Sequence, residues 1–352
     1  MNEFGEMTIE EIINDKFDEY LEITNSSFFK DKVVLVTGAG GSIGQKLSQT
    51  LLTTGVQQVI LLDNSEGALF DIQQTLVLRE VTNFIIELAD ITCKEAITDV
   101  FKKHQPDLVY HAAAYKHVPM LEDFPKQAFK VNVIGTKNIL ENAIKGNACE
   151  FVLISTDKAV HPKSVMGVSK RLAELYVSQY INKTTTNIKV VRFGNIPYTS
   201  GSVLLSWKKQ LKLTGQINLV QSNMFRYFVS INQVCKMLLG IMEDTQKSLF
   251  ISEMGNPVEM NKLATKFLLK NKREITDIKW TSKRPGEKEK EVLKYAEELT
   301  TKVEAANYSY GNLKTDSKQV EKVNNLIEKY NKHNKEELKS LFKEIVPEYN
   351  LV

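Results

Sequence analysis

KVVLVTGAGGSIG, residues 32–44, is the stretch that decides the fold. A run of β-branched residues stands directly before a glycine-rich turn, and the turn leads into a helix that begins near Ile43. Glycines 38, 41 and 44 allow a tight turn, a close approach of the backbone to a pyrophosphate, and close packing of helix on strand. Ser42 and Ile43, at the helix start, offer unpaired N–H groups to phosphates. The stretch therefore predicts a dinucleotide-binding unit.

Further β-branched runs follow, separated by helical patterns: QVILL at 58–62, FIIEL at 84–88, LVYHA at 108–112, FVLIS at 151–155 and IKVVRF at 188–193. This alternation predicts an α/β fold of the Rossmann type, a doubly wound parallel sheet with helices on both faces. After residue 194, glycines and prolines interrupt shorter elements, which predicts a smaller C-terminal substrate-binding lobe. We expect an N-terminal helical extension (1–29), an NAD(P)-binding Rossmann domain (30–194), a mainly substrate-binding lobe (195–292) and a charged tail (293–352).

Composition excludes several classes of protein. The 46 basic and 43 acidic residues nearly cancel, so no broad charge footprint for nucleic acid exists. The three cysteines are far apart in the sequence, which predicts neither a disulfide framework nor a metal site and fits a cytoplasmic protein. No window of about 18 apolar residues occurs, so we expect no membrane span, and the N-terminus does not have the pattern of a signal peptide.

Both ends of the chain carry helical periodicity. At the N-terminus the apolar positions are Ile9, Ile12, Ile13, Phe17, Tyr20 and Leu21, and this stretch is expected to dock on the body of the protein or on a partner subunit. From Glu287 the chain is rich in Lys and Glu, with Val320, Val323, Ile327 and Tyr330 at a rough helical period. That pattern is typical of a solvated helical surface.

Two acidic residues follow strands of the expected dinucleotide site. Asp63 ends the second strand, where its carboxylate can accept hydrogen bonds from the adenosine ribose hydroxyls. A 2′-phosphate would be repelled there, which favours NAD, with NADP as the alternative. Asp90 and Ile91, after the third strand, are placed to meet the adenine edge, and Asp90 is equally suited to cap the next helix.

Two longer segments lie at strand ends, where ligands bind in doubly wound sheets. In HAAAYKHVPMLED, residues 111–123, the small side chains of Ala112, Ala113 and Ala114 leave room for a nicotinamide ribose, and Lys116 and His117 reach the cleft. In STDKAVHPKSVMGVSK, residues 155–170, Asp157 and Lys158 leave a buried strand and Lys170 follows on a helix. An acid and a potential base at one strand end indicate proton transfer.

The chain resembles the extended short-chain dehydrogenases, and within them the nucleotide-activated N-acetylhexosamine 4,6-dehydratases of bacterial polysaccharide biosynthesis. The resemblance covers roughly residues 30–292. Its motifs, in order, are TGAGGSIG, AAAYKHVPMLE, NVIGTKN, ISTDKAV, MGVSKRLAE, RFGN, SGSV, RYF and RPGEK. The TDKA and YKHVP segments are the ones specific to this subgroup.

The resemblance implies a three-step reaction on a UDP- or GDP-N-acetylglucosamine. Hydride leaves C4 for the nicotinamide, water is lost across C5 and C6, and the hydride returns to C6. Lys158 would be the base at C5 and Asp157 the acid at the C6 hydroxyl. We expect burial to favour the neutral amine of Lys158 and the protonated form of Asp157, with Lys170 adding positive charge nearby.

One position departs from the wider superfamily. Most short-chain dehydrogenases carry Tyr four residues before the helix lysine, and here that residue is Met166. A thioether cannot take the proton of the C4 hydroxyl, although a subset of the dehydratase family resembles this chain in having Met there. Thr156, Asp157 or an ordered water next to Lys170 are the candidate acceptors, and Lys170 is expected to bind the nicotinamide ribose.

In the lobe, the resemblance implies a set of residues over the sugar nucleotide: Asn195, Ser202, Val203, Arg226, Arg284 and Glu287. Arginines supply a planar fork of donors for a diphosphate, and Glu287 can bind ribose hydroxyls. Pro197 and Tyr198 depart from the small-residue loop commonly found there, which leaves the base, uridine or guanosine, open.

Two other functions compete with the dehydratase. A sugar-nucleotide 4-epimerase shares the fold, the cofactor and the 4-keto intermediate, but epimerases generally retain the Tyr that Met166 replaces. A catalytically silent nucleotide-binding homologue is the second alternative, and Met166 is its only support. Extended family members commonly associate through the helices that flank the catalytic lysine, so we also expect a homo-oligomer.

Overall fold

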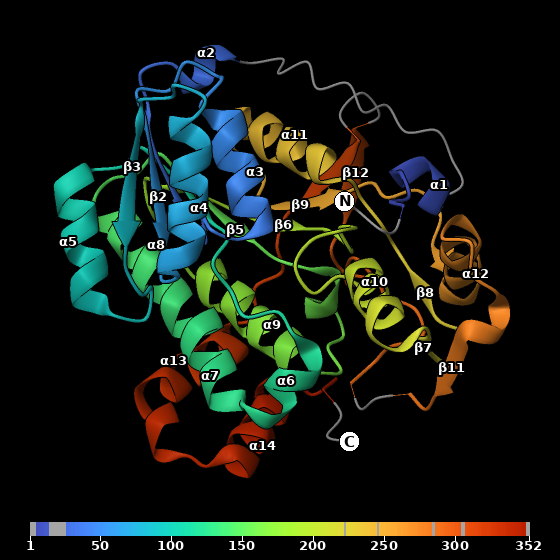
Figure 1. The fold of residues 1–352 in the computed structure, drawn as a ribbon. Helices are drawn as coiled ribbons and strands as arrows, with labels where there is room; N and C mark the ends of the chain where they lie inside the picture. The colour runs from blue at the N-terminus through green and yellow to red at the C-terminus, as the bar shows by residue number, and fades with distance from the viewer. Residues whose placement is uncertain are drawn as a thin grey trace.

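The described residues place nine strands in one sheet, in the order β12-β13-β9-β6-β5-β4-β1-β2-β3 (Figure 1). We describe the protein from a computed structural model, which covers residues 5–13, 26–221, 223–244, 246–283, 286–303 and 307–349. The parallel strands are β1 (Val33–Thr37), β2 (Gln58–Asp63), β3 (Phe84–Leu88), β4 (Leu108–His111), β5 (Glu150–Ile154), β6 (Asn187–Arg192) and β9 (Leu249–Ser252). Each of the six predicted runs is one of these strands, and the Rossmann-type α/β fold is confirmed.

The register aligns the carboxyl ends of the central strands. Thr37 of β1 pairs with Leu62 of β2 on one side and with His111 of β4 on the other, and His111 pairs with Leu153 of β5. The segments that follow these strands therefore emerge along a single edge, where ligands bind in this fold.

Alternation along each buried strand gives the sheet two apolar faces. In β1, Val34 and Val36 join one core and Leu35 joins the other. The helices that contribute to the first core are α3 (Ser42–Leu51), α4 (Glu66–Val77) and α11 (Ile231–Gly240). Those that contribute to the second are α5 (Lys94–His104), α8 (Thr136–Lys145) and α9 (Val165–Ser178). Figure 1 shows these two groups on opposite sides of the sheet.

Short elements join this framework. They are α2 (Ser26–Phe29), α6 (Val118–Asp123), α7 (Pro125–Phe129), the π-helical turn η1 (Lys130–Gly135) that runs into α8, and the 3₁₀ turns η2 (Asp157–Ala159) and η3 (Ile241–Glu243). The turn η2 follows β5 directly, so the strand end presents Asp157 and Lys158 at the carboxyl edge of the sheet.

A smaller lobe has its own apolar core. Its helices are α10 (Val203–Thr214) and α12 (Met260–Lys270), and its strands form two pairs: β7 (Ile217–Val220) with β11 (Ile278–Thr281), and β8 (Phe225–Arg226) with β10 (Val258–Glu259). The 3₁₀ turn η4 (Ile275–Asp277) precedes β11. Trp207 and Phe267 lie at the centre of this core with their rings 5.5 Å apart.

The N-terminal segment docks on this lobe. Ile9, Ile12 and Ile13 of α1 (Ile9–Ile13) are buried in the lobe core, which confirms docking on the body for these positions. The backbone N–H of Met7 donates to the Tyr198 hydroxyl at 2.6 Å. The predicted apolar positions Phe17, Tyr20 and Leu21 lie outside the described residues.

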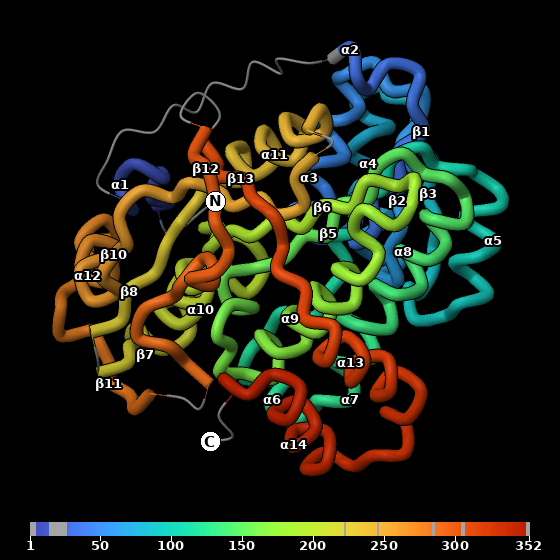
Figure 2. The backbone as a smooth tube through the Cα atoms, turned by 180° about the vertical axis from the view of Figure 1, so that it is seen from behind, coloured from blue at the N-terminus to red at the C-terminus, as the bar shows by residue number. Residues whose placement is uncertain are grey.

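The C-terminal tail is not the solvated surface that its composition predicts. Strands β13 (Tyr308–Gly311) and β12 (Thr300–Val303) extend the main sheet: β13 pairs antiparallel with β9, and β12 pairs antiparallel with β13. Helix α13 (Ser317–Lys329), the turn η6 (Tyr330–Lys332) and helix α14 (Lys335–Ile345) pack beside α9 and α7, as Figure 2 shows. Val320, Val323 and Tyr330 are buried, and Ile327 packs against the same core. The prediction was wrong because the Lys and Glu residues occupy only the outer faces of these helices.

A buried ion network also ties the tail to the sheet. The Arg192 guanidinium, fully buried on β6, donates to Glu174 of α9 at 2.7 Å and to Glu298 at 2.6 Å. Two carboxylates on one guanidinium compensate the desolvation of all three groups, so removal of either acid would leave a buried charge with fewer partners.

Replacement of Phe342 tests whether the tail belongs to the core. Phe342 is fully buried on α14 and stacks on Phe129 of α7 with ring centroids 5.9 Å apart. We expect Phe342→Ala to lower the free energy of unfolding by about 3 to 5 kcal/mol because it leaves a cavity. The exposed neighbour Lys343 provides the control, and Lys343→Ala is expected to change the free energy of unfolding by less than about 0.5 kcal/mol. Chemical denaturation measures the effect of both substitutions. Equally small effects would contradict the conclusion that the tail belongs to the core.

Candidate functional site

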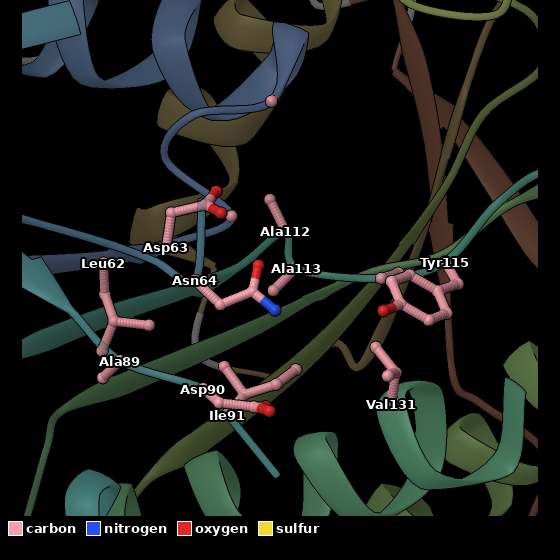
Figure 3. Close-up of a pocket in the computed structure, with 13 residues that line it drawn as sticks. Leu62, Asp63, Asn64, Ala89, Asp90, Ile91, Ala112, Ala113, Tyr115 and Val131 are labelled. Atoms are coloured by element: carbon pink, nitrogen blue, oxygen red, sulfur yellow. The ribbon is translucent and has the colours of Figure 1, made fainter. Parts of the chain in front are cut away.

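A first pocket, about 570 Å³ of empty space open to solvent, lies at the carboxyl ends of β1, β2 and β4. In Figure 3, Asp63 and Asn64 lie on one side, Tyr115 and Val131 on the other, and Ala112 and Ala113 between them. Its lining includes most of the residues predicted for a dinucleotide: Gly38, Gly41, Asp63, Asp90, Ile91, Ala112, Ala113 and Ala114. Segments that follow β1, β2, β3 and β4 therefore meet here, because the carboxyl ends of these strands lie along one edge of the sheet.

Two glycines in the loop cannot be replaced without moving the backbone. Gly38 has a φ of +69°, and a Cβ there would lie 2.6 Å from the backbone nitrogen of Ala113. A Cβ on Gly44 would lie 2.1 Å from the Gly38 carbonyl oxygen. The helix α3 can therefore start directly after the turn that follows β1, and its first residues, Ser42 and Ile43, do not line the pocket. This is the cradle that a pyrophosphate requires.

The acidic residues of this pocket are held by backbone donors. The two carboxylate oxygens of Asp63 accept from the N–H groups of Gly40 at 2.9 Å and Ser65 at 3.0 Å, and each keeps a further lone pair for a ribose hydroxyl. Asp90 accepts from the Thr92 N–H at 2.8 Å, whereas the residue that caps α5 is Cys93. The alternative prediction of Asp90 as the helix cap is therefore wrong.

Sequence reasoning missed some residues of the first pocket. They are Leu62, Asn64, Ala89, Tyr115 and Val131. Asn64 and Tyr115 stand next to Asp63 and Ala114, so the rule that strand ends bind ligands could have found them. Val131 comes from the π-helical turn η1, which no periodicity in the sequence indicated.

The pair at the end of β5 is fixed by several short contacts. Asp157 is fully buried, and its Oδ1 accepts from Lys158 Nζ at 3.0 Å and from the Thr156 hydroxyl at 2.8 Å. Its Oδ2 is buried with no hydrogen-bond partner among the described residues. Lys158 Nζ also donates to the Asn195 side-chain oxygen at 3.3 Å. One carboxylate oxygen is thus committed to the pair and the other is available.

The protonation state expected for Lys158 needs correction. Burial favours its neutral amine, but the carboxylates of Asp157 and Glu291 outweigh burial, so the pKa of Lys158 is raised above its ordinary value. The prediction that burial and Lys170 favour the neutral amine of Lys158 was wrong, because it left out the opposing carboxylates of Asp157 and of Glu291, whose Oε1 lies 4.0 Å from Nζ. Lys158 is therefore an ammonium group in the structure as it stands.

A second pocket, about 510 Å³ of empty space, lies beside this pair. Of the residues predicted for substrate it is lined by Arg226 and Glu287, together with Lys158; its other lining residues are Val118, Lys163, Ser164, Gly286, Lys288 and Glu291. Sequence reasoning missed this last group, although Lys288 ends the RPGEK motif and Glu291 lies three residues after it.

The remaining predicted substrate residues that the structure describes do not line this pocket. Asn195 contacts Lys158, and Ser202 and Val203 begin α10, with the Ser202 hydroxyl oxygen lacking a partner among the described residues. Lys116 is exposed, and the His117 ring lies against Gly201, where a Cβ would approach it to 2.2 Å. Arg284 lies outside the described residues.

Tyr198, which departs from the small-residue loop common in the resembling family, has a structural role that the sequence did not indicate. It adopts a φ of +56° and bonds the N-terminal segment through Met7. Two residues on, the Ser200 N–H donates to the Ser42 hydroxyl of the glycine loop at 3.2 Å. The loop around residue 198 therefore bridges the lobe and the start of α3.

Helix α9 carries Met166 and Lys170, and every residue of this helix is buried. Lys170 Nζ donates to the Ile154 carbonyl oxygen at 2.7 Å, and burial, partly offset by Glu174, lowers the pKa of Lys170 to about 8. Met166 packs into the apolar core. Because α13 and its neighbours cover α9, the predicted association through the helices that flank Lys170 is wrong for α9, while homo-oligomer formation stays a prediction.

The described residues contain no metal-ion site of the common kind. They hold no cluster of three or more His, Cys, Asp or Glu side chains suited to a metal ion. Nor do they contain a helix with the length and apolar character that crossing a bilayer requires.

Several curated proteins are similar to this chain in sequence. The chain is 38% identical to the capsular polysaccharide biosynthesis protein CapD of Staphylococcus aureus over 76% of its length, and it spans about half of that protein (45%). It is 38% identical to a protein of Methanocaldococcus jannaschii described as an uncharacterized membrane protein, over 91% of this chain and 98% of that one. A UDP-glucose 4-epimerase of Rickettsia rickettsii is 28% identical over 80% of this chain and 82% of the epimerase.

Solved structures share the fold. Pen from Bacillus thuringiensis superposes with a TM-score of 0.75 at 26% identity, over 81% of this chain and 90% of that one. The dTDP-glucose 4,6-dehydratase DesIV of Streptomyces venezuelae gives a TM-score of 0.65 at 19% identity, over 74% and 88% of the two chains. The model of one family, described as polysaccharide biosynthesis protein, matches residues 34–312, and those residues contain both pockets and the pair at the end of β5. The chain belongs to this polysaccharide biosynthesis protein family.

Proposed function

We propose that the protein is a sugar-nucleotide 4,6-dehydratase that converts UDP- or GDP-N-acetylglucosamine to the 4-keto-6-deoxy sugar nucleotide. The observation that carries this proposal is the contact between Asp157 and Lys158 at the end of β5, with Lys158 lining the second pocket. An acid and a base in adjacent positions suit the removal of a proton from one carbon and of a hydroxyl from the next.

The first pocket is the proposed NAD site. The cradle around Gly38 and Gly44 would take the pyrophosphate, Asp63 the adenosine ribose, and Ala112 to Ala114 the nicotinamide ribose, to which Lys170 is also assigned. The carboxylate of Asp63 would repel a 2′-phosphate, which favours NAD over NADP. When bound, the nicotinamide supplies the oxidation at C4 and the later reduction at C6. DesIV, a dehydratase of the same fold, has been solved with NAD bound.

Asp157 can supply the proton acceptor that the thioether of Met166 cannot provide. Its Oδ2 has no hydrogen-bond partner among the described residues, and we assign to this oxygen the proton of the C4 hydroxyl. The resulting carboxylic acid can then give that same proton to the departing C6 hydroxyl, which leaves as water. One group thus serves both steps, and Asp157 returns to its ionised form without a proton from solvent. Thr156 is less suited because its hydroxyl already donates to Asp157.

Lys158 would act at C5. As a neutral amine it removes the C5 proton, which the 4-keto group makes acidic, and as an ammonium it returns a proton to C5 after reduction at C6. Arg226 and Glu287 of the second pocket, with Asn195, Ser202, Val203, Lys116 and His117 around it, are the proposed contacts to the sugar nucleotide. Arg226 donates to the carbonyls of Phe225 and Glu289, which orients its guanidinium fork.

An epimerase is the second candidate. The Rickettsia rickettsii relative carries that name, and an epimerase shares the 4-keto intermediate. An epimerase needs no acid at C6, however, and Met166 replaces the tyrosine that epimerases generally use. The pair Asp157 and Lys158 therefore favours the dehydratase.

The direct test is incubation of the purified protein with UDP-N-acetylglucosamine and, separately, with GDP-N-acetylglucosamine. The proposal predicts a product lighter by one water from one of them, with a 4-keto signal in the NMR spectrum, and this also identifies the base. An isomer of unchanged mass would instead identify an epimerase. No conversion of either sugar, with nucleotide binding intact, would support the silent homologue.

Three substitutions separate the proposed roles. Asp157→Asn and Lys158→Ala are expected to lower kcat by about 10² to 10⁴ because each removes an acid–base group. Met166→Leu, which nearly conserves volume at this buried position, is expected to keep most of the activity because a thioether transfers no proton. Steady-state rates with circular dichroism as a folding check measure all three. Equal losses of activity in all three correctly folded variants would refute the acid–base roles proposed for Asp157 and Lys158.

A further inference from the structure

The backbone just after the pair at the end of β5 is strained. His161, three residues after Lys158, has a φ of +43°, in the left-handed region that a side chain disfavours. His161 is exposed, so burial of its imidazole does not account for this conformation. A residue without a glycine's freedom stays in this region only when its surroundings hold it there.

Two side chains from a distant part of the chain hold the peptide group that joins Val160 to His161. Lys288 Nζ donates to the Val160 carbonyl oxygen at 2.6 Å, and the His161 N–H donates to the Tyr295 hydroxyl at 3.2 Å. We call Lys288 and Tyr295 the clamp. The clamp binds both polar groups of one peptide, so a rotation of His161 to a negative φ would break at least one of these hydrogen bonds.

Tyr295 is itself held in place. It is 7% exposed, and the Arg171 guanidinium lies 4.7 Å from the centre of its ring. Its hydroxyl lies 2.9 Å from Glu348 Oε1 and 3.3 Å from the Ala159 carbonyl oxygen, and its single proton goes to one of these acceptors at a time. Glu348 stands in the C-terminal tail, beyond residues 34–312 that the family model matches. The tail therefore reaches the turn η2 through Tyr295.

Helix α9 supports the same turn from another side. A Cβ on Gly167 would lie 2.4 Å from the Lys158 carbonyl oxygen, so the helix backbone directly adjoins the turn. The Asp157 N–H donates to the Phe193 carbonyl oxygen at 3.2 Å. The backbone of the pair is thus fixed by α9 and β6, whereas the residues that follow it depend on the clamp.

We propose that Tyr295 is a positioning residue for the reaction, and this inference rests on the proposed function. The clamp holds the strained peptide group in the form that keeps the pair at the end of β5 in its working geometry. Tyr295 lines neither pocket, so it acts through the turn and not by contact with a ligand. A displacement of about 1 Å in a catalytic group can cost about 10² in rate, so a small relaxation of the turn is enough to matter.

The first test compares Tyr295→Phe with Tyr110→Phe. Each substitution removes one buried tyrosine hydroxyl, and that of Tyr110 donates to the Leu238 carbonyl oxygen at 2.9 Å, on the core that contains α11. For Tyr295→Phe we expect kcat to fall at least about tenfold, with KM for the sugar nucleotide within about twofold of wild type. Tyr110→Phe is expected to keep kcat. Equal values of kcat in the two variants would overturn the proposal.

A glycine at position 161 provides the rescue. Glycine adopts positive φ about as readily as negative φ, so the turn needs the clamp less. In the His161→Gly background, Tyr295→Phe is therefore expected to lower kcat by less than about threefold. A loss as large as in the wild-type background would mean that Tyr295 acts in another way. An inactive His161→Gly protein would also count against the proposal, which requires the conformation of residue 161 and not its side chain.

Amide hydrogen exchange, read by mass spectrometry, tests the clamp without turnover. Peptides of Tyr295→Phe that span His161 are expected to exchange at least about tenfold faster than in wild type, while peptides from α11 are unchanged. Unchanged exchange at His161 overturns the inference, as does faster exchange with an unchanged kcat. If the wild type releases no water from either sugar nucleotide, the proposed function fails by itself, and the exchange rates still decide whether Tyr295 holds the turn.

Discussion

The carboxylate of Asp157 is fully buried and is stabilised by the ammonium group of Lys158, 3.0 Å away. The surrounding elements hold these two groups together. The parallel register brings β5 to the same edge as the glycine loop, and η2 turns both side chains there. Behind them, Glu174 on α9 is held ionised by Arg192, since that guanidinium outweighs burial and lowers the pKa of Glu174 to about 2. Fixed charges on rigid elements would keep the proposed proton-transfer site in place without reorganisation during the reaction.

The part of this arrangement that local chemistry dictates could be predicted from the sequence. β-branched runs separated by helical periods predicted six of the nine strands of the main sheet, because a parallel sheet buries both faces of its strands and leaves a continuous apolar signal. The glycines at 38 and 44 were informative for a steric reason: a side chain at either position would collide with backbone. Asp63, Asp157 and Lys158 were found because they follow strands directly, and strand ends share one edge.

What the sequence could not show depends on contacts between distant segments. Glu291 meets Lys158 across more than a hundred residues, and Asp157 and Glu291 together raise the pKa of that lysine, against the expectation from burial. Phe342 and Glu298 come from a tail whose composition resembles a solvated surface, yet one stacks on α7 and the other pairs with Arg192. Hydrophobic residues on a narrow stripe of a charged helix give a weak pattern, and only the partner surface reveals that the stripe is buried.

The claim on which the account depends is that hydride removed from C4 stays on the enzyme while Asp157 and Lys158 act at C6 and C5. Its most direct test is an isotope experiment with the sugar nucleotide deuterated at C4, run in ordinary water and followed by NMR. The account predicts that the deuterium is found at C6 of the product and that, for unlabelled substrate in ²H₂O, solvent deuterium enters at C5. Deuterium that remains at C4, or that is lost to water, would contradict it.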